Sequence, residues 1–143
     1  MDLVSTILLT NVIIHCGLAL HVLWRDPASP VNRSFAYFSG SLALWGVGAF
    51  GMWQAAPDQV LGWTRFAFVG PALIPWSFLN FVGLFTRSAT LQKMARALFP
   101  LSWVFVAAAP TSFLLKELKG PFLSGPEYGY LYPVLVAAVG GAA

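Results

Sequence analysis

The sequence predicts an all-α fold, a polytopic bundle of transmembrane helices. Of its 143 residues, 58% are hydrophobic and only 9% are charged, and the mean hydropathy is +0.74. Because a soluble domain carries about 25% charged residues, this composition excludes a water-soluble globular monomer, and the hydrophobicity excludes a disordered chain. A helix needs about 20 apolar residues to cross a bilayer. The length therefore predicts one membrane-embedded domain over residues 1–143, with four full spans and a truncated fifth.

The first predicted span covers residues 3–24, and the second covers residues 34–53. The first lacks the basic start and the small-residue cleavage site of a signal peptide, which indicates an uncleaved span. In the loop between the two spans, Ser29 before Pro30 is typical of a helix N-cap and first turn. The next loop, residues 54–59, is short, so the second and third spans are expected to be antiparallel neighbours.

The third predicted span, residues 61–85, contains Pro71 and Pro75 on one face of the helix, four positions apart. Each proline removes a backbone hydrogen-bond donor. We therefore expect a kink near the middle of this span, which a membrane helix tolerates better than a soluble one.

A basic stretch over residues 87–96 is expected to lead into a fourth span over residues 98–115, with Pro110 in its second half. Residues 124–127 match a capping box, which predicts a fifth helix over residues 128–143. The uninterrupted apolar part of that helix spans only about 20 Å at helical rise, too short to cross comfortably. The chain is therefore expected to be a fragment, or a protein whose remaining helices are elsewhere.

The basic residues in the loops predict the orientation of the chain. The first and third loops hold five of them, whereas the N-terminus and the other loops hold two. By the positive-inside rule the N-terminus faces outside and the first and third loops face the cytoplasm. The basic residues are scattered and form no patch for a nucleic acid. The first group is Arg25, Arg33, Arg87, Lys93 and Arg96, and the second is Lys116 and Lys119.

The spacings typical of soluble enzymes are absent from the sequence. There is no phosphate-binding loop, no zinc spacing and no pair of carboxylates within one span, so we expect no catalytic residue, no metal and no cofactor. Residues 46–51 spell the dinucleotide-binding fingerprint, but the strand before it and the acid after it are missing. We interpret Ser39, Ala43 and Gly46 instead as a small-residue face that lets another helix approach closely.

Polar side chains inside the predicted spans are candidate functional residues. Asn11 and His15 share a helix face, which predicts either an interhelical hydrogen bond or a ligand-sensing or proton-sensing site. Asn80 lies deep in the third span, where a contact between helices is expected. Trp45 and Trp76 lie near mid-membrane and are expected in core packing or in a pocket wall.

Arg65 lies about one turn inside the third span. A charge at this depth either extends its side chain to the interface or needs a partner. Pairing with Asp58, seven residues earlier, is one alternative, and lining an outward-facing pocket is another. Trp63 falls near the end of the span, as expected for an aromatic belt.

Several motifs resemble the N-terminal seven-helix sensor region of prokaryotic histidine kinases. The resemblance covers about residues 3 to 90 and lies in the runs 24–35, 42–48, 63–70 and 71–81. In that family the second helix carries a Leu/Ala–Trp pair. The third carries Trp-x-Arg, an aromatic residue with glycine, then proline and a phenylalanine. The residues at these places are Trp45, Trp63, Arg65, Gly70, Pro75 and Phe81.

The resemblance implies a sensor in the plasma membrane of a prokaryote, with its N-terminus outside. On this interpretation we expect Arg65, Trp63, Trp45 and Asn80 to be pocket or coupling residues. The expected partners are the lipid bilayer and a missing or separate cytoplasmic signalling domain, and a homodimer is possible. The chain contains no phosphoacceptor box and no ATP-binding box, so we expect no kinase activity of its own.

A small transporter, or a subunit of a larger membrane complex, is the alternative interpretation. A span broken near the membrane midplane, as Pro71 and Pro75 would produce, is common in transporters. The sequence shows no internal repeat, which transporters usually have. A membrane-embedded enzyme is a weaker alternative, for which only His15 offers a catalytic group.

Overall fold

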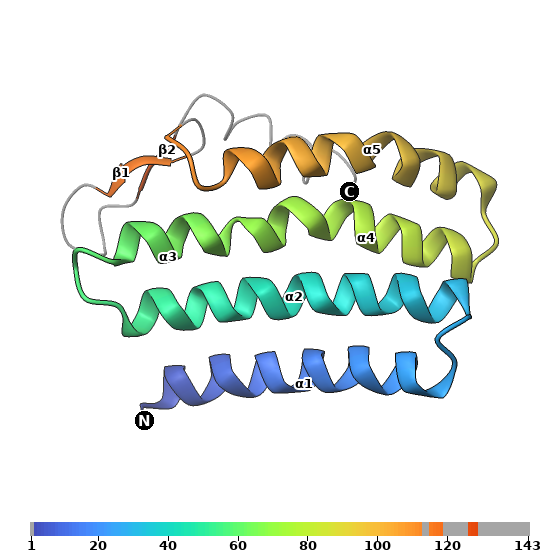
Figure 1. Cartoon of the computed structure of the whole chain (residues 1–143), viewed down its shortest axis with the longest axis horizontal. Helices are drawn as coiled ribbons and strands as arrows, with labels where there is room; N and C mark the ends of the chain where they lie inside the picture. The colour runs from blue at the N-terminus through green and yellow to red at the C-terminus, as the bar shows by residue number, and fades with distance from the viewer. Residues whose placement is uncertain (1, 113–114, 119–125, 129–143) are drawn as a thin grey trace.

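The computed structural model describes residues 2–112, 115–118 and 126–128. Over these residues the chain is helical except for one short hairpin, so the predicted all-α fold class is confirmed. Figure 1 shows the helices side by side in one layer, with α1 at one edge and α5 at the other. The helices are α1 Leu3–Arg25, α2 Pro30–Gln54, α3 Val60–Ala67, α4 Val69–Phe85 and α5 Ala89–Ala108; the strands are β1 Leu115–Leu118 and β2 Pro126–Tyr128.

Each helix packs mainly against the next span in the chain. α1 packs against α2, α2 packs against α3 and α4, and α4 packs against α5. Within the described part of the chain, three segments are long and apolar enough to cross a membrane: α1, α2 and the combined α3–α4 segment over residues 60–85. The apolar side chains on their outer faces suit a bilayer, where lipid tails solvate them.

Three helices begin with a side chain that accepts a hydrogen bond from the first turn. Asp2 accepts from the Ser5 N–H in α1, and Ser29 accepts from the Asn32 N–H in α2. Ser88 accepts in the same way at α5. Each cap satisfies a backbone donor that has no partner within the helix. The predicted pairing of a Ser29 cap with Pro30 in the first turn is confirmed.

The corner between α1 and α2 is closed by side-chain amide and carboxylate groups. Nδ2 of Asn32 donates to the carbonyl oxygens of Val22 and Asp26, at 3.1 Å each. Oδ1 of Asp26 accepts from the N–H groups of Ala28 and Ser29. Asn32 therefore supplies a second donor to the Val22 carbonyl, which also accepts from the Asp26 N–H, and a donor to the Asp26 carbonyl just past the end of α1.

The third span is interrupted at Phe68, where α3 ends and α4 begins. The Phe68 N–H bonds to the Arg65 carbonyl, three residues back, instead of continuing the four-residue pattern. Pro71 has no N–H to offer the Ala67 carbonyl, and Pro75 lies inside α4. The interruption thus falls just before the first proline, in the stretch where the prolines weaken the backbone hydrogen bonding.

The helix that contains the start of the predicted fourth span, residue 98, begins earlier, at Ala89. Arg87 adopts a left-handed conformation with φ of 55°, and the Ser88 N–H bonds to the Gly83 carbonyl. These features turn the chain sharply after α4. The basic residues Lys93 and Arg96, expected in a loop, consequently lie on the first turns of α5.

The predicted end of the fourth span at residue 115 is wrong, because α5 ends at Ala108. Pro110 has no N–H to offer the Val106 carbonyl, and it follows the helix instead of lying within it; Ala109, the residue before it, keeps helical dihedrals. The proline inside α5 is Pro100. Leu115, expected at the helix end, begins β1.

The predicted fifth helix does not begin at residue 128 as expected. Pro126–Tyr128 forms strand β2, which pairs antiparallel with β1 and places Tyr128 opposite Leu115. Strand pairing engages backbone groups that the first turn of a helix would leave without partners. Residues 129–143, the rest of that predicted helix, lie outside the described residues.

The interior of the layer is built mainly from alanine, serine and glycine. Ser39, Ser77 and Ala72 are almost completely buried. A Cβ added at Gly48 would collide with the backbone of Ala67 in α3, and one added at Gly70 would lie 2.8 Å from the Ser41 carbonyl. Small residues therefore let α2 approach α3 and α4 at backbone distance, as is common between membrane helices.

Candidate functional site

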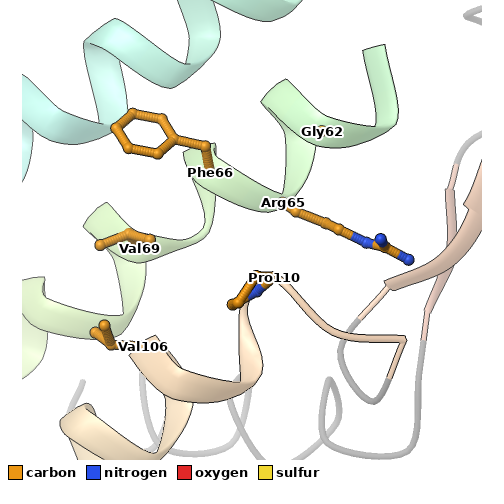
Figure 2. A pocket seen from close by; sticks show the side chains of 6 residues that line it. All are labelled: Gly62, Arg65, Phe66, Val69, Val106 and Pro110. Atoms are coloured by element: carbon orange, nitrogen blue, oxygen red, sulfur yellow. The ribbon is translucent and has the colours of Figure 1, made fainter. Parts of the chain in front are cut away.

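A pocket of about 400 Å³ lies where the broken third span faces the end of α5. Pockets of this size hold small molecules. Figure 2 shows its walls, with α3 and the start of α4 on one side and the end of α5 on the other. The lining residues are Gly62, Arg65, Phe66, Val69, Val106 and Pro110.

The pocket follows from the way in which the helices pack. α3 packs along α2, whereas α5 packs along α4. The two helices therefore diverge beyond the interruption at Phe68, where the floor is a tightly packed cluster. Ala72, Phe105 and Ala109 form that cluster, and Val69 packs against it. The short helix α3 and the end of α5 thus leave a hollow that α4 closes on the inner side.

Arg65 is half-buried, and among the described residues it is the one charged side chain in the wall of this pocket. Figure 2 shows its side chain extending along the pocket edge and past Pro110. One alternative drawn from the sequence placed Arg65 in the wall of an outward-facing pocket. The structure places Arg65 in a pocket wall, and the side of the membrane that this pocket faces stays a prediction. Asp58, the partner considered in another alternative, is exposed in the turn before α3, and the described residues include no ion pair between the two.

Trp63 lies beside this pocket, in the wall of a second and more open hollow of about 560 Å³. Its ring packs where Gly51 of α2 leaves space, since a Cβ at Gly51 would collide with the indole. The ring also meets Phe66 edge-on, with centroids 6.0 Å apart. Gly62 and Phe66 line both hollows, so α3 separates them. The second hollow is lined by Val47, Gln59, Gly62, Trp63 and Phe66.

Trp45 and Asn80 are not among the residues that line either hollow. Trp45 is half-exposed on α2, and its backbone lies against Gly70 of α4. Asn80 is half-buried near the far end of α4, beyond Pro75. The structure therefore places Arg65 and Trp63 close together on α3, and it places Trp45 and Asn80 elsewhere along the layer.

Trp76 lies in an aromatic group that connects three helices. Its ring is 5.9 Å from that of Tyr37 in α2 and 5.1 Å from that of Phe99 in α5. Such tilted and edge-on pairs stabilise packing beyond the area that they bury. The group acts as packing across the layer and lies outside both hollows.

His15 forms an interhelical hydrogen bond with Ser39 of α2. The Ser39 hydroxyl donates to the His15 carbonyl at 3.1 Å, and Nδ1 of His15 lies 3.2 Å from the same hydroxyl oxygen. Asn11, exposed on the same helix, lies near Gly46. Ser39, Ala43 and Gly46 are all buried.

An unpredicted polar contact joins the start of α1 to the end of α2. Nε1 of Trp53 donates to Oδ2 of Asp2 at 3.0 Å, and the Ser5 N–H donates to Oδ1 at 2.7 Å. These two donors, Trp53 first, lower the pKa of Asp2 from 3.8 to about 2. The partners are 51 residues apart, so no local pattern in the sequence could reveal the contact. The one sequence feature that could have suggested this contact is the acidic residue, Asp2, directly before the first span.

No group of three or more His, Cys, Asp or Glu residues that could hold a metal ion is found in the described part of the chain. Comparison with protein families matches residues 7–140 to the family described as the N-terminal 7TM region of histidine kinase. No curated protein and no solved structure matches the chain. The resemblance drawn from the sequence is therefore confirmed, and it extends well beyond the motifs that suggested it.

Proposed function

The chain belongs to the family of N-terminal 7TM regions of histidine kinases, and we propose that it is the sensor input region of a membrane signalling protein. The family match over residues 7–140 carries this proposal. Three segments able to cross a membrane support it. In this proposal the chain itself is not an enzyme, and any phosphotransfer takes place in a cytoplasmic signalling domain that is its partner.

We propose further that the chain lies in the plasma membrane of a prokaryote with its N-terminus outside. The two turns that join α1 to α2 and α4 to α5 lie at the same end of the layer (Figure 1). That end carries Arg25, Arg33 and Arg87, whereas Asp2 and Asp58 flank helices at the opposite end. Basic residues favour the cytoplasmic side, which supports this orientation.

The interrupted third span is the proposed coupling element. α3 lines the pocket at the outer end, and α4 continues from the interruption to the sharp turn at Arg87. A displacement of α3 against α5 would pass along α4 to the cytoplasmic end. A break in a helix is a position where such a shift can be absorbed by few residues.

The test measures histidine phosphorylation in vesicles that contain the full receptor to which this region belongs. Pro71→Ala restores an N–H that can bond to the Ala67 carbonyl and favours a continuous α3–α4 helix. We expect the variant to change phosphorylation about two-fold or more, the size of effect seen along coupling elements. Pro30→Ala is the matched control, because a proline at the first helical position removes no intrahelical bond.

Equal phosphorylation in wild type, P71A and P30A would count against the coupling role of the interruption. The sensor proposal itself is overturned if the kinase behaves identically when an unrelated membrane anchor replaces residues 1–143. Both outcomes are read at equal receptor amounts in the membrane, so that changes in insertion do not mimic changes in signalling.

The transporter alternative has one observation in its favour, the interruption of the third span at Phe68. Broken helices that face a cavity hold substrates in many transporters. Uptake of a solute into vesicles that depends on this chain and is lost in P71A would favour that alternative. Absence of such uptake, together with a change in phosphorylation, supports the sensor.

A further inference from the structure

We propose that the Arg65 pocket binds a single-chain amphiphile with an anionic head group, such as a carboxylate with a tail of about ten carbons. The proposal names a ligand class for the sensor, and it rests on the proposed function only for its signalling consequence. Within the part of the chain that the structure describes, the pocket combines one cationic side chain with five lining residues that offer no charged side chain.

The polarity of the pocket changes along the helix axes. Gly62, Arg65 and Pro110 lie toward the end of the layer at which α3 begins and α5 ends. Val69 is one turn further along α3–α4, and Val106 is one turn back along α5, so both lie deeper. A ligand in this pocket would meet the charge at the rim and apolar side chains inside. An amphiphile with its head outward matches that order.

The depth of Arg65 fits a head group at the boundary of the bilayer. Arg65 lies five residues after the start of α3, or about 7.5 Å along the axis. Its long side chain extends past Pro110, away from the deeper valine side chains (Figure 2). A guanidinium can hold a carboxylate or phosphate through two parallel hydrogen bonds. The apolar tail would then run along Phe66 toward Val69 and Val106.

The volume of the pocket favours a ligand that has a single alkyl chain. A volume of about 400 Å³ holds roughly a dozen non-hydrogen atoms at about 30 Å³ each. Decanoate has that number of atoms, whereas a two-chain phospholipid has several times as many. A small inorganic anion would fill a minor part of the volume and leave the apolar wall without contact. The volume and the single cation therefore both favour a short amphiphile over a phospholipid or free phosphate.

The test uses the full chain in nanodiscs of phosphatidylcholine, with decanoate labelled at its carboxyl carbon as the probe. Binding is followed by NMR titration. We expect saturable binding to wild type and binding about ten-fold or more weaker to Arg65→Gln, which keeps the stem but loses the charge. Arg65→Lys is expected to retain most of the binding. Arg96→Gln, which removes a charge from an exposed position on α5, is the matched control and should bind as wild type does.

Two further measurements keep the result decisive if the R65Q variant does not fold. Val106→Trp fills the deep part of the pocket and should weaken decanoate binding without removing any charge. Decanol has the same tail without the anionic head and should bind wild type more weakly than decanoate does. Unchanged decanoate binding in V106W, or equal affinity for decanol and decanoate, overturns the proposal.

The source of the anion is tested by competition. Phosphatidylglycerol added to the nanodisc should not displace decanoate, and displacement would assign the pocket to a phospholipid head group and overturn the single-chain ligand. Inorganic phosphate should not compete either, and competition would assign the site to a free anion. Decanoate that binds as expected but leaves histidine phosphorylation unchanged would overturn the sensing role while the binding site stands.

Discussion

At the scale of single residues, a small number of polar side chains fix the position of α1 against α2. Only 9% of the residues are charged, yet the ends of α1 are both fixed by side-chain hydrogen bonds. Asp2 contacts Trp53 at one end, and Asn32 contacts Val22 at the other. α1 has Ser5 as its one buried residue, so these polar contacts decide where the helix sits against α2.

We expect Asn32→Ala to lower the free energy of unfolding by about 1–2 kcal/mol, because the Asp26 carbonyl loses its side-chain donor and the Val22 carbonyl keeps only the Asp26 N–H. The measurement is thermal unfolding of the chain in nanodiscs. Asn80→Ala is the matched control, since Asn80 is also half-buried but forms no hydrogen bond with the described residues. A loss of stability in N80A as large as that in N32A would contradict the role assigned to the corner.

The contact between Asp2 and Trp53 predicts a local dependence on pH. The folded pKa of Asp2, about 2, lies below the ordinary value of 3.8. The stabilisation is therefore fully present above about pH 4 and is lost as the pH falls through the folded pKa. We expect the indole N–H signal of Trp53 to shift with a midpoint near pH 2 in an NMR titration. Asp2→Asn should abolish that transition, and its persistence would assign it to another group.

At the scale of helices, glycines set how closely α2 can approach its neighbours. A Cβ at Gly48 would collide with the backbone of Ala67, which cannot move without shifting α3. We expect Gly48→Ala to destabilise the chain by about 1–3 kcal/mol through overpacking. Gly17→Ala is the control, because nothing lies within 4 Å of a Cβ there. It should be neutral or slightly stabilising in a helix. Equal stabilities of the two variants in denaturant titrations would refute the close packing.

The sequence could predict the first three spans because each has a long apolar run and a capping or breaking residue at its end. Ser29 and Pro30 marked the start of α2. α5 was predicted less well, because its first turns carry Lys93 and Arg96, and hydropathy alone assigns such residues to a loop. The Ser88 cap and the left-handed Arg87 fix its start, and these depend on local geometry.

The candidate site was predictable only in part. The sequence identifies Arg65 as a candidate because a charged side chain inside an apolar span needs a partner or a route to the interface. Val106 and Pro110, which form the opposite wall, carry no such signal. Their place in the pocket depends on where α5 ends and on its packing against α4 rather than α3. Tertiary packing of this kind is not encoded in any local pattern of the sequence.

At the scale of the whole molecule, the helices form an open layer in place of a closed bundle. α1 packs against α2, and α5 lies at the opposite edge of the layer (Figure 1). In the described part of the chain each helix packs mainly against its neighbours in the layer, so a shift between α3 and α5 is opposed mainly by α2 and α4. The pocket at one end and the basic turns at the other are joined by α4 and by α5, since Val106 near the end of α5 lines the pocket and Lys93 and Arg96 lie on its first turns.

The orientation of this layer in the membrane can be measured by labelling cysteines introduced at two exposed alanines, one at each end of the layer. Ala28 is exposed in the turn between α1 and α2, and Ala56 is exposed in the turn between α2 and α3, at opposite ends of the layer. We replace each with cysteine in a Cys16→Ser background, because Cys16 is itself exposed. Basic residues near the first turn should keep it in the cytoplasm. A membrane-impermeant maleimide should therefore label A56C in intact cells and label A28C only after the cells are broken. The reverse pattern would place the Arg65 pocket on the cytoplasmic side, and a ligand would then have to reach it from inside the cell.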